Sequence, residues 1–331
     1  MKHSNISVFI PHNGCPHQCS FCNQKSITGQ AYQPTAEDVR KTLRQARLDL
    51  GERAKNAEIA FFGGSFTAID REYMISLLDA AREFEGVFSG IRISTRPDAI
   101  DAEILALLKE YGVAAIELGA QSMDDHVLAL NERGHSAEDV RTASRLIKSF
   151  GFSLGLQMMT GLYGSDFDKD RHTAEKFIAL EPDTVRIYPT VVMKGTALEK
   201  YFLNGSYKPY TLKESVELCA ELIRKFEDNK INIIRVGLHY SDSLIENGYC
   251  ENYHPAFKEL CESKLFYNSF LEKTKLLESR NIDITINRKS LSKLYGQRKC
   301  NLRAFEEMGY RVNIIFDDSL EKYEMRIGVS V

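Results

Sequence analysis

From Ile6 to about Gly237 the chain alternates short apolar runs with longer amphipathic stretches, and this alternation constrains the fold more than any other feature. Such a pattern is typical of β-strands that a helix connects to the next parallel strand. We count six or seven of these units. The pattern therefore predicts an α/β fold whose parallel sheet forms either a barrel or an open doubly wound sheet. The expected strands are Ile6–Ile10, Ala57–Phe62, Ile91–Thr95, Val113–Leu118, Phe152–Met158, Thr184–Tyr188 and Ile231–Val236.

Residues suited to ligand binding follow several of these strands. In both architectures the ligand site lies at the carboxyl ends of the strands. A glycine pair lets backbone approach a ligand closely, and carboxylate or carboxamide groups can bind the hydroxyls of a sugar. Taken singly, each residue is more often part of a turn or a satisfied polar group. The residues at strand ends are a cysteine-rich loop, Gly63-Gly64-Ser65, Thr95, Glu117, Gln121, Gln157 and Tyr188-Pro189.

The loop after the first strand carries Cys15, Cys19 and Cys22. Three thiolates at this spacing can hold three corners of a cubane cluster and leave the fourth iron open for chemistry. Zinc is the main alternative, because Cys-x2-Cys pairs bind it and His12 or His17 could complete a Cys3His site. A group of unliganded thiols is a further alternative. The absence of an obvious second ligand pair downstream favours an iron–sulfur site.

The composition limits the compartment and the kind of partner. With 43 basic and 46 acidic residues the net charge is −3, which argues against a protein whose whole surface coats nucleic acid. No apolar run approaches the ~18 residues of a membrane span, and the first one is too short for a signal-peptide core. Cysteines outside the loop are scattered, which suits a reducing compartment. We therefore expect a cytosolic protein. The scattered cysteines are Cys219, Cys250, Cys261 and Cys300.

Four segments together resemble the radical S-adenosylmethionine (SAM) core of the Elongator catalytic subunit family, and the resemblance covers about Ile6 to Gly237. The cysteine spacing, with Phe21 before the third cysteine, would alone specify only the radical SAM superfamily. The string Tyr-Pro-Thr-Val-Val-Met-Lys-Gly-Thr narrows the resemblance to the Elongator-like family. The four segments are Cys15–Cys22, Glu117–Ser122, Gly155–Leu162 and Ile187–Thr196.

The resemblance implies a partial (β/α)6 barrel with one [4Fe–4S] cluster held by Cys15, Cys19 and Cys22, and with SAM across the strand ends. In that superfamily SAM chelates the open iron, and an electron from the cluster breaks a C–S bond of SAM to give a 5′-deoxyadenosyl radical. A reductant protein such as a flavodoxin or ferredoxin is the implied electron donor. The implied SAM contacts are Phe21 near the adenine, Gly63 and Gly64 at the methionine amino group with Ser65 and Thr95 beside them, and Glu117, Gln121, Arg133 and Gln157 at the carboxylate or ribose.

The same family modifies the wobble uridine of tRNA with an acetyl group supplied through a C-terminal acetyltransferase domain. Only about 94 residues follow Gly237, and they contain no recognisable acyl-CoA pyrophosphate loop. The resemblance therefore supports radical chemistry without supporting acetyl-CoA as a co-substrate.

The end of the chain carries a local basic segment. Between Arg288 and Arg303 there are six basic and no acidic residues, which favours a phosphate partner. The surrounding pattern of strand, helix, loop, helix and strand resembles a KH-type RNA-binding unit, although Lys299 replaces the second glycine of its Gly-x-x-Gly loop. A solvated helix–turn–helix packed on the barrel explains the segment nearly as well. The expected RNA contacts are Lys293, Gly296, Gln297, Arg298 and Lys299.

The sequence thus predicts two domains, a radical SAM partial barrel over 1–237 and a small α+β appendage over 238–331. The expected function is SAM cleavage for RNA modification, with a tRNA uridine as the target. One alternative keeps the enzyme but replaces RNA with a small metabolite or peptide. Another is a non-catalytic RNA-binding protein with structural zinc. His239 and His254 are weak candidates for acid–base roles near the barrel mouth.

Overall fold

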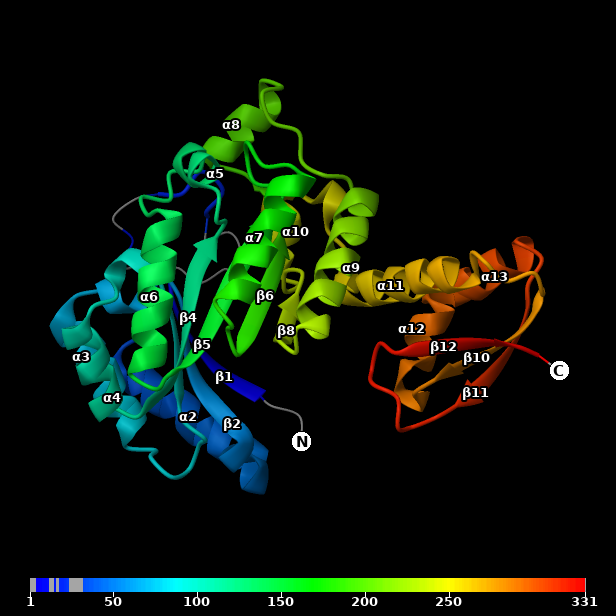
Figure 1. The fold of residues 1–331 in the computed structure, drawn as a ribbon. Coiled ribbons are helices and arrows are strands. Elements are labelled where there is room, and N and C mark those ends of the chain that lie inside the picture. Colours follow the sequence, from blue (N-terminus) through cyan, green and yellow to red (C-terminus); the bar gives the residue numbers. More distant parts are fainter. Residues whose placement is uncertain (1–3, 12–14, 16–17, 24–31, 331) are drawn as a thin grey trace.

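Seven parallel strands form the main sheet of the computed structural model, which describes residues 4–11, 15, 18–23 and 32–330. The strands follow one another in sequence order, and each pairs in parallel with the next. Figure 1 shows the sheet curled into a half-barrel with helices on its outer face. The α/β class, the partial barrel and all seven expected strands are confirmed. The strands are β1 (Ser4–Ile10), β2 (Ala57–Gly63), β3 (Ile91–Thr95), β4 (Val113–Gln121), β5 (Ser153–Thr160), β6 (Thr184–Pro189) and β8 (Asn232–Val236).

Six longer helices connect these strands, and their starts follow from capping chemistry. Thr35 and Asp38 form the expected capping box, with the Thr35 N–H donating to Asp38 Oδ2 over 2.8 Å. Ser136 caps the fourth of these helices, which ends before Gly151, a residue with φ of 77°. The helices are α2 (Ala36–Leu50), α3 (Arg71–Arg82), α4 (Ala102–Glu110), α6 (Ala137–Ser149), α7 (Phe167–Ala179) and α9 (Leu212–Asp228).

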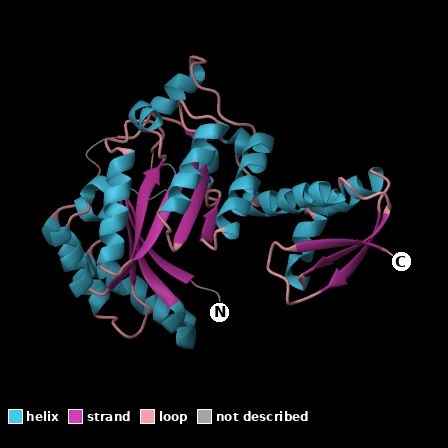
Figure 2. Cartoon of the chain, in the orientation of Figure 1, coloured by secondary structure: helices cyan, strands magenta, loops and turns pink. Residues whose placement is uncertain are grey.

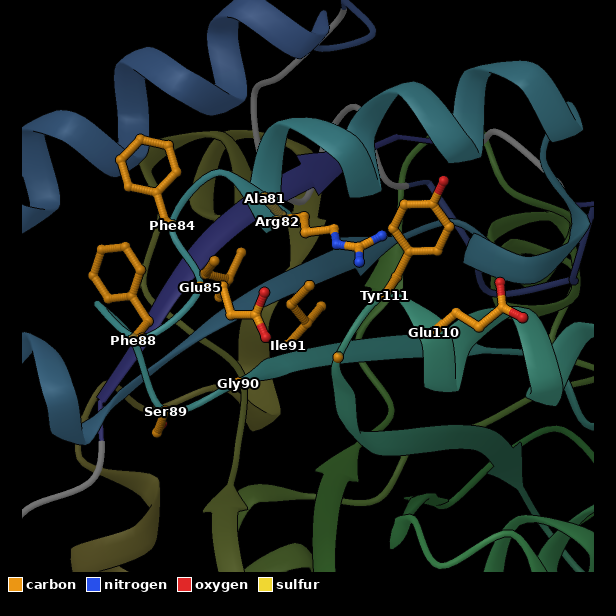
Figure 3. Close-up of a pocket in the computed structure, with 13 residues that line it drawn as sticks. Ala81, Arg82, Phe84, Glu85, Phe88, Ser89, Gly90, Ile91, Glu110 and Tyr111 are labelled. Atoms are coloured by element: carbon orange, nitrogen blue, oxygen red, sulfur yellow. The ribbon is translucent and has the colours of Figure 1, made fainter.

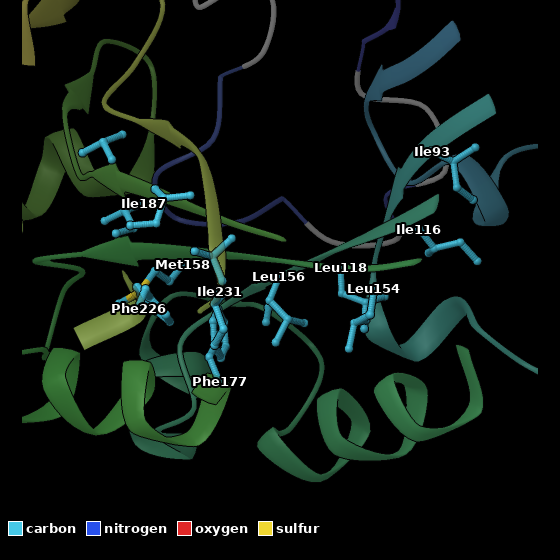
Figure 4. Close-up of a cluster of buried hydrophobic side chains, with 14 of the residues drawn as sticks. Ile93, Ile116, Leu118, Leu154, Leu156, Met158, Phe177, Ile187, Phe226 and Ile231 are labelled. Atoms are coloured by element: carbon cyan, nitrogen blue, oxygen red, sulfur yellow. The ribbon is translucent and has the colours of Figure 1, made fainter. Parts of the chain in front are cut away.

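The two faces of the sheet carry different side chains, because successive side chains of a strand point to opposite faces. On β5, Leu154, Leu156 and Met158 are buried, and Figure 4 shows them with Phe177 of α7 and Phe226 of α9 in the layer between sheet and helices. Burial of each such side chain contributes on the order of 2 kcal/mol. The alternate positions of β5 lie on the concave face. The outer face therefore supplies stability and leaves the concave face for polar groups.

Short elements cover the carboxyl ends of the strands. The most notable is an antiparallel pair of strands that joins Val192 to Tyr249 and Met193 to Gly248. The sequence pattern did not predict this pair, since each of its strands has only two residues. The short elements are α5 (Asp125–Leu130), β7 (Val192–Met193), α8 (Ala197–Leu203), α10 (Asp242–Asn247) and β9 (Gly248–Tyr249).

The end of the chain forms a second, smaller α+β unit, visible beside the barrel in Figures 1 and 2. Its three-stranded sheet has the order β11-β10-β12, with β10 parallel to β11 and antiparallel to β12. The expected pair of helices lies between β10 and β11, whereas β12 is an addition to the predicted elements. The unit comprises α11 (Phe257–Thr274), β10 (Asn281–Ile286), α12 (Leu291–Tyr295), α13 (Cys300–Glu307), β11 (Arg311–Phe316) and β12 (Met325–Val329).

The hydrophobic core runs from the barrel into this unit. Phe266 of α11 and Phe305 of α13 belong to the same buried cluster as Phe226 of the barrel helix α9. A domain division at residue 237 therefore stays a prediction. Within the described ranges, none of the helices combines the length and the apolar content that crossing a bilayer requires.

Candidate functional site at the barrel mouth

The cysteine loop is fastened to the barrel mouth by backbone and side-chain hydrogen bonds at Ser20. The Ser20 hydroxyl donates to Asn131 Oδ1 over 2.8 Å, and the Ser20 N–H donates to the Asn131 carbonyl over 3.2 Å. On the other side, the Leu198 N–H of α8 donates to the Ser20 carbonyl over 2.7 Å. Asn131 is fully buried at the end of α5. These bonds fix the middle of the loop to two elements distant in sequence.

Arg133 connects the loop to the end of β4. Its Nη1 donates to Cys19 Sγ over 2.9 Å, and its Nη2 donates to the Gly119 carbonyl over 2.5 Å. Its guanidinium also lies 5.8 Å from the centre of the Phe21 ring. A cationic donor at a cysteine sulfur favours the thiolate, and hydrogen bonds to cysteine sulfur are among the factors that set the potential of an iron–sulfur cluster. The surroundings of Cys19 therefore fit a cluster ligand.

The other two expected ligands are less constrained by the described residues. Cys15 is exposed as a residue, but desolvation of its thiol and the neighbouring Cys19 raise its pKa, against the opposing effect of Arg96 and Arg133. Cys22 is half-buried. In the described part of the chain no three His, Cys, Asp or Glu side chains converge as a metal-binding set. The ligand role of the three cysteines stays a prediction, and the alternative zinc ligands His12 and His17 lie outside the described residues.

The glycine pair lies where β1 and β2 end side by side. Gly63 pairs with Ile10 and has φ of 119°, and a Cβ at this position would collide with the Ile10 carbonyl. The Gly64 N–H donates to the same carbonyl over 2.7 Å. Close strand approach and a positive φ thus both require glycine at position 63. The pair lies beside the cysteine loop as expected, whereas its contact with SAM stays a prediction.

Ser65 and Thr95 are buried and hold each other. Their hydroxyl oxygens are 2.9 Å apart, and Ser65 Oγ also accepts from the Arg96 N–H over 3.0 Å. Arg96 in turn donates to the Arg133 carbonyl over 2.6 Å. In this arrangement the two hydroxyls position the backbone that carries Arg96 and Arg133.

Gln121 combines two features that are typical of ligand sites. It is a non-glycine residue with φ of 68°, at an irregularity in the pairing of β4 with β5. Its Oε1 is buried without a hydrogen-bond partner among the described residues, and so is Nε of Arg133. Strained backbone and unpaired buried polar atoms are both costly and occur together mainly at functional sites. One acceptor and one donor beside Cys19 fit the amino and carboxylate groups of a bound SAM.

Glu117 and Gln157 lie deeper, in a buried ionic network on the concave face. Arg186 donates to both Glu117 oxygens, over 2.6 Å and 2.8 Å, and Arg92 Nη1 donates to Oε1 over 3.3 Å. Gln157 Nε2 donates to Oε2 over 2.8 Å. Burial acts to lower the pKa of Arg186, but Tyr188 and Glu117 outweigh it and raise the pKa. Both Glu117 oxygens are thus already occupied, and its SAM contact stays a prediction.

Three participants in this arrangement were not singled out from the sequence: Asn131, Arg92 and Arg186. Arg92 also donates to Glu58 over 2.6 Å, so a chain of alternating charges crosses β2, β3, β4 and β6. The available signal was a charged residue inside a short apolar strand, as in Ile91-Arg92-Ile93 and Val185-Arg186-Ile187. Burying an unpaired charge is expensive, so such residues predict partners on neighbouring strands.

The five expected RNA contacts gather at the turn between α12 and α13. Gly296, Arg298 and Lys299 have φ of 69°, 50° and 59°, so this turn places two non-glycine residues in the left-handed region. Gln297, Arg298 and Lys299 are exposed, and Lys293 is half-buried. Lys299 Nζ lies 5.9 Å from the centre of the Tyr295 ring. The structure brings these residues together on the C-terminal unit, and their contact with RNA stays a prediction.

A separate pocket of about 240 Å³ lies at the amino-terminal end of β3. Figure 3 shows Arg82 beside Tyr111, with Ile91 and Glu110 nearby. None of the expected site residues lines it. In barrels of this kind the amino-terminal ends of the strands serve stability, whereas ligands bind at the opposite ends. We therefore assign the functional site to the cysteine end.

Comparisons with known proteins identify the family of this chain. A profile described as the radical SAM superfamily matches residues 9–177, and one described as a radical SAM C-terminal domain matches residues 182–266. The tRNA uridine(34) acetyltransferase of Dehalococcoides mccartyi is 27% identical over 78% of this chain and 64% of its own length. Human Elongator complex protein 3 is 28% identical over 66% of this chain and 45% of its own length. The chain thus spans about half to two thirds of these relatives.

A solved structure of a related protein has a similar fold. The archaeal Methanocaldococcus infernus Elp3 with an N-terminal deletion superposes with a TM-score of 0.61 at 22% identity, over 82% of this chain and 63% of that one. The superfamily match covers half of the chain and includes the cysteine loop, β4 and β5. The chain therefore belongs to the radical SAM superfamily, and it is an enzyme whose cofactors are a [4Fe–4S] cluster and S-adenosylmethionine.

Proposed function

We propose that this enzyme cleaves SAM to modify RNA and that its target is a uridine of tRNA. The observation that carries the proposal is the arrangement at Cys19, where Arg133 donates to the sulfur and where Gln121 and Arg133 each have a buried polar atom without a partner among the described residues. Two relatives of this chain are named for uridine-34 of tRNA or for Elongator. A tRNA substrate would place the enzyme in the cytosol.

The cofactor roles follow from position. Cys15, Cys19 and Cys22 would hold three irons, and the cluster with its open iron supplies the electron that cleaves SAM. Gly63 and Gly64 are half-buried beside the loop and would let SAM approach the backbone closely, and Phe21 would offer an aromatic face. Arg133 would donate to the Cys19 sulfur and orient the SAM carboxylate, while Gln121 would accept from the amino group. The buried network of Glu117, Arg92, Arg186 and Gln157 keeps the floor of the site rigid and excludes water.

The substrate side rests on the C-terminal unit. The basic turn at Arg298 and Lys299 presents exposed positive charge, which suits an RNA phosphate. Acetyl transfer is not part of the proposal, because the relatives named for it extend well beyond the region that this chain matches. A reductant protein such as a flavodoxin or ferredoxin completes the system.

The test is release of 5′-deoxyadenosine by the anaerobically reconstituted and reduced enzyme, with and without bulk tRNA. We expect tRNA to stimulate release and to carry a new modification, which mass spectrometry of its nucleosides would locate. Release that ignores tRNA would overturn the RNA half and point to a small metabolite or peptide. Tightly bound zinc at Cys15, Cys19 and Cys22 in place of iron and sulfide would overturn the whole proposal.

A further inference from the structure

The concave face of the barrel holds one cation more than its carboxylates can neutralise. Glu58 and Glu117 face Arg92 and Arg186, and the ion pairs among these four residues use both carboxylates. Arg235 of β8 is the fifth charged residue of this face. Among the described residues no carboxylate lies within ion-pair distance of Arg235, whose side chain makes one hydrogen bond, from Nε to the Gly237 carbonyl over 2.7 Å.

The position of Arg235 faces the site rather than bulk solvent. It is the register partner of Arg186, so the two side chains leave the sheet on the same, concave face. It is the last residue but one of β8, at the carboxyl end where ligands of such barrels bind. The residue is half-buried. A partly buried guanidinium without a counter-ion is costly, and a bound anion removes that cost.

Arg235 has further charged and polar residues around it at the carboxyl end of β8. Burial lowers the pKa of Arg235, and the charge of Arg186 acts in the same direction. Burial also lowers the pKa of His239, again with help from Arg235 and Arg186. The hydroxyl of Tyr253 is buried without a hydrogen-bond partner among the described residues. Tyr253 lines a small pocket together with Gly237, whose carbonyl accepts from Arg235. This end of the barrel therefore offers a cation and a hydroxyl without a partner, and no described carboxylate pairs with that cation.

We propose that Arg235 anchors an anion subsite in the barrel mouth and binds a phosphate group of the substrate, with Tyr253 as a second donor. A guanidinium matches phosphate through two parallel hydrogen bonds. The phosphate can belong to an RNA backbone or to a phosphorylated small molecule. That the phosphate belongs to RNA rests on the proposed function, whereas the presence of the anion subsite does not.

The first arm of the test measures phosphate selectivity without RNA. Dissociation constants of uridine 5′-monophosphate and uridine are compared for the full chain, reconstituted with its cluster and saturated with SAM. We expect the monophosphate to bind at least about tenfold more tightly. Arg235→Gln should bring the two constants together, and Arg235→Lys should restore part of the preference. Arg224→Gln is the matched control, because Arg224 is exposed and paired with Asp228.

The second arm uses an anticodon stem–loop RNA and measures affinity against salt concentration. Arg235→Gln should reduce the salt slope by about one unit, and Arg224→Gln should leave it unchanged. The subsite would be overturned if wild type and Arg235→Gln had the same ratio of the uridine and uridine-monophosphate dissociation constants and the same salt slope for the RNA. A wild type that binds neither the monophosphate nor the RNA would overturn it as well. A third outcome separates the two proposals. If Arg235→Gln loses the preference for the monophosphate while the wild type does not bind the RNA, the subsite is supported and the RNA function is rejected.

Discussion

The barrel and the C-terminal unit both carry clusters of basic residues, but in opposite surroundings. Arg92 and Arg186 of the barrel are buried and pair with carboxylates at 2.6–3.3 Å. Arg298 and Lys299 of the C-terminal unit are exposed, and no described carboxylate pairs with them. Buried paired charges are strongly coupled to folding, whereas exposed unpaired charges act on ligands through the solvent. Under the proposed function, the barrel would fix the geometry of the chemistry and the C-terminal unit would attract its substrate.

The largest effect is expected when a cysteine of the barrel mouth is compared with one of the C-terminal unit. Cys19→Ala should abolish both cluster loading and SAM cleavage, because two thiolates cannot hold the cubane with one open iron. Cys300→Ala is the control, since Cys300 is exposed at the start of α13. Iron and sulfide content and 5′-deoxyadenosine release measure the outcome. Cleavage retained by Cys19→Ala would contradict the assignment of the site.

The second effect compares ion pairs. Glu117→Ala leaves Arg92 and Arg186 buried without their shared carboxylate, and we expect it to lower the free energy of unfolding by about 3–5 kcal/mol. Glu324→Ala in the C-terminal unit removes a half-buried partner of Arg326 that also accepts from the Glu321 N–H, and it should lower the free energy of unfolding by no more than about 1 kcal/mol. Urea unfolding of each full-length variant and of the wild type, under the same conditions, measures both changes in the free energy of unfolding. Equal losses in the two variants would show that the barrel network is not coupled to folding.

The sequence predicted the sheet well and the ionic network poorly, and the reason is physical. An apolar run reports burial locally, so all seven strands could be placed from their own residues. The network depends on which residues become neighbours across strands. Arg186 binds Glu117 from 69 positions away, and periodicity within one strand does not contain that register. The pair β7 and β9 was not predicted, because each strand has only two residues and the two pair across a long stretch of sequence.

The site itself was predictable in kind but not in detail. The cysteine loop and the glycine pair lie at the carboxyl ends of the strands, because parallel strands bring those ends to one edge. The SAM contacts of Gln121 and Arg133 stay predictions, and each residue has a buried polar atom without a partner among the described residues. The roles of Glu117 and Gln157 were not predictable. Glu117 pairs with Arg186, because a buried carboxylate needs a cation as its partner, and Gln157 donates to Glu117.

The third effect concerns RNA affinity. Replacing Lys293, Arg298 and Lys299 together by Gln should weaken tRNA binding roughly ten- to a hundredfold at physiological salt and reduce the salt slope by about three units. The matched control replaces Lys41, Arg44 and Arg47 of α2, which are exposed on the barrel. Filter binding over a range of salt concentrations measures both quantities. An equal loss in the control triple would mean that general charge, and not this turn, attracts the RNA.

The smallest effect separates charge from backbone at one residue of that turn. Lys299 has φ of 59°, so Lys299→Gly relieves left-handed strain but increases the freedom of the unfolded chain, and we expect stability to change by less than about 1 kcal/mol. If charge is the main contribution of Lys299, the salt slope for tRNA falls by about one unit. Lys299→Gln, which keeps the side-chain bulk, should give the same slope. Tighter binding by Lys299→Gly than by the wild type would instead show that close backbone approach outweighs the charge, as in a loop with two glycines.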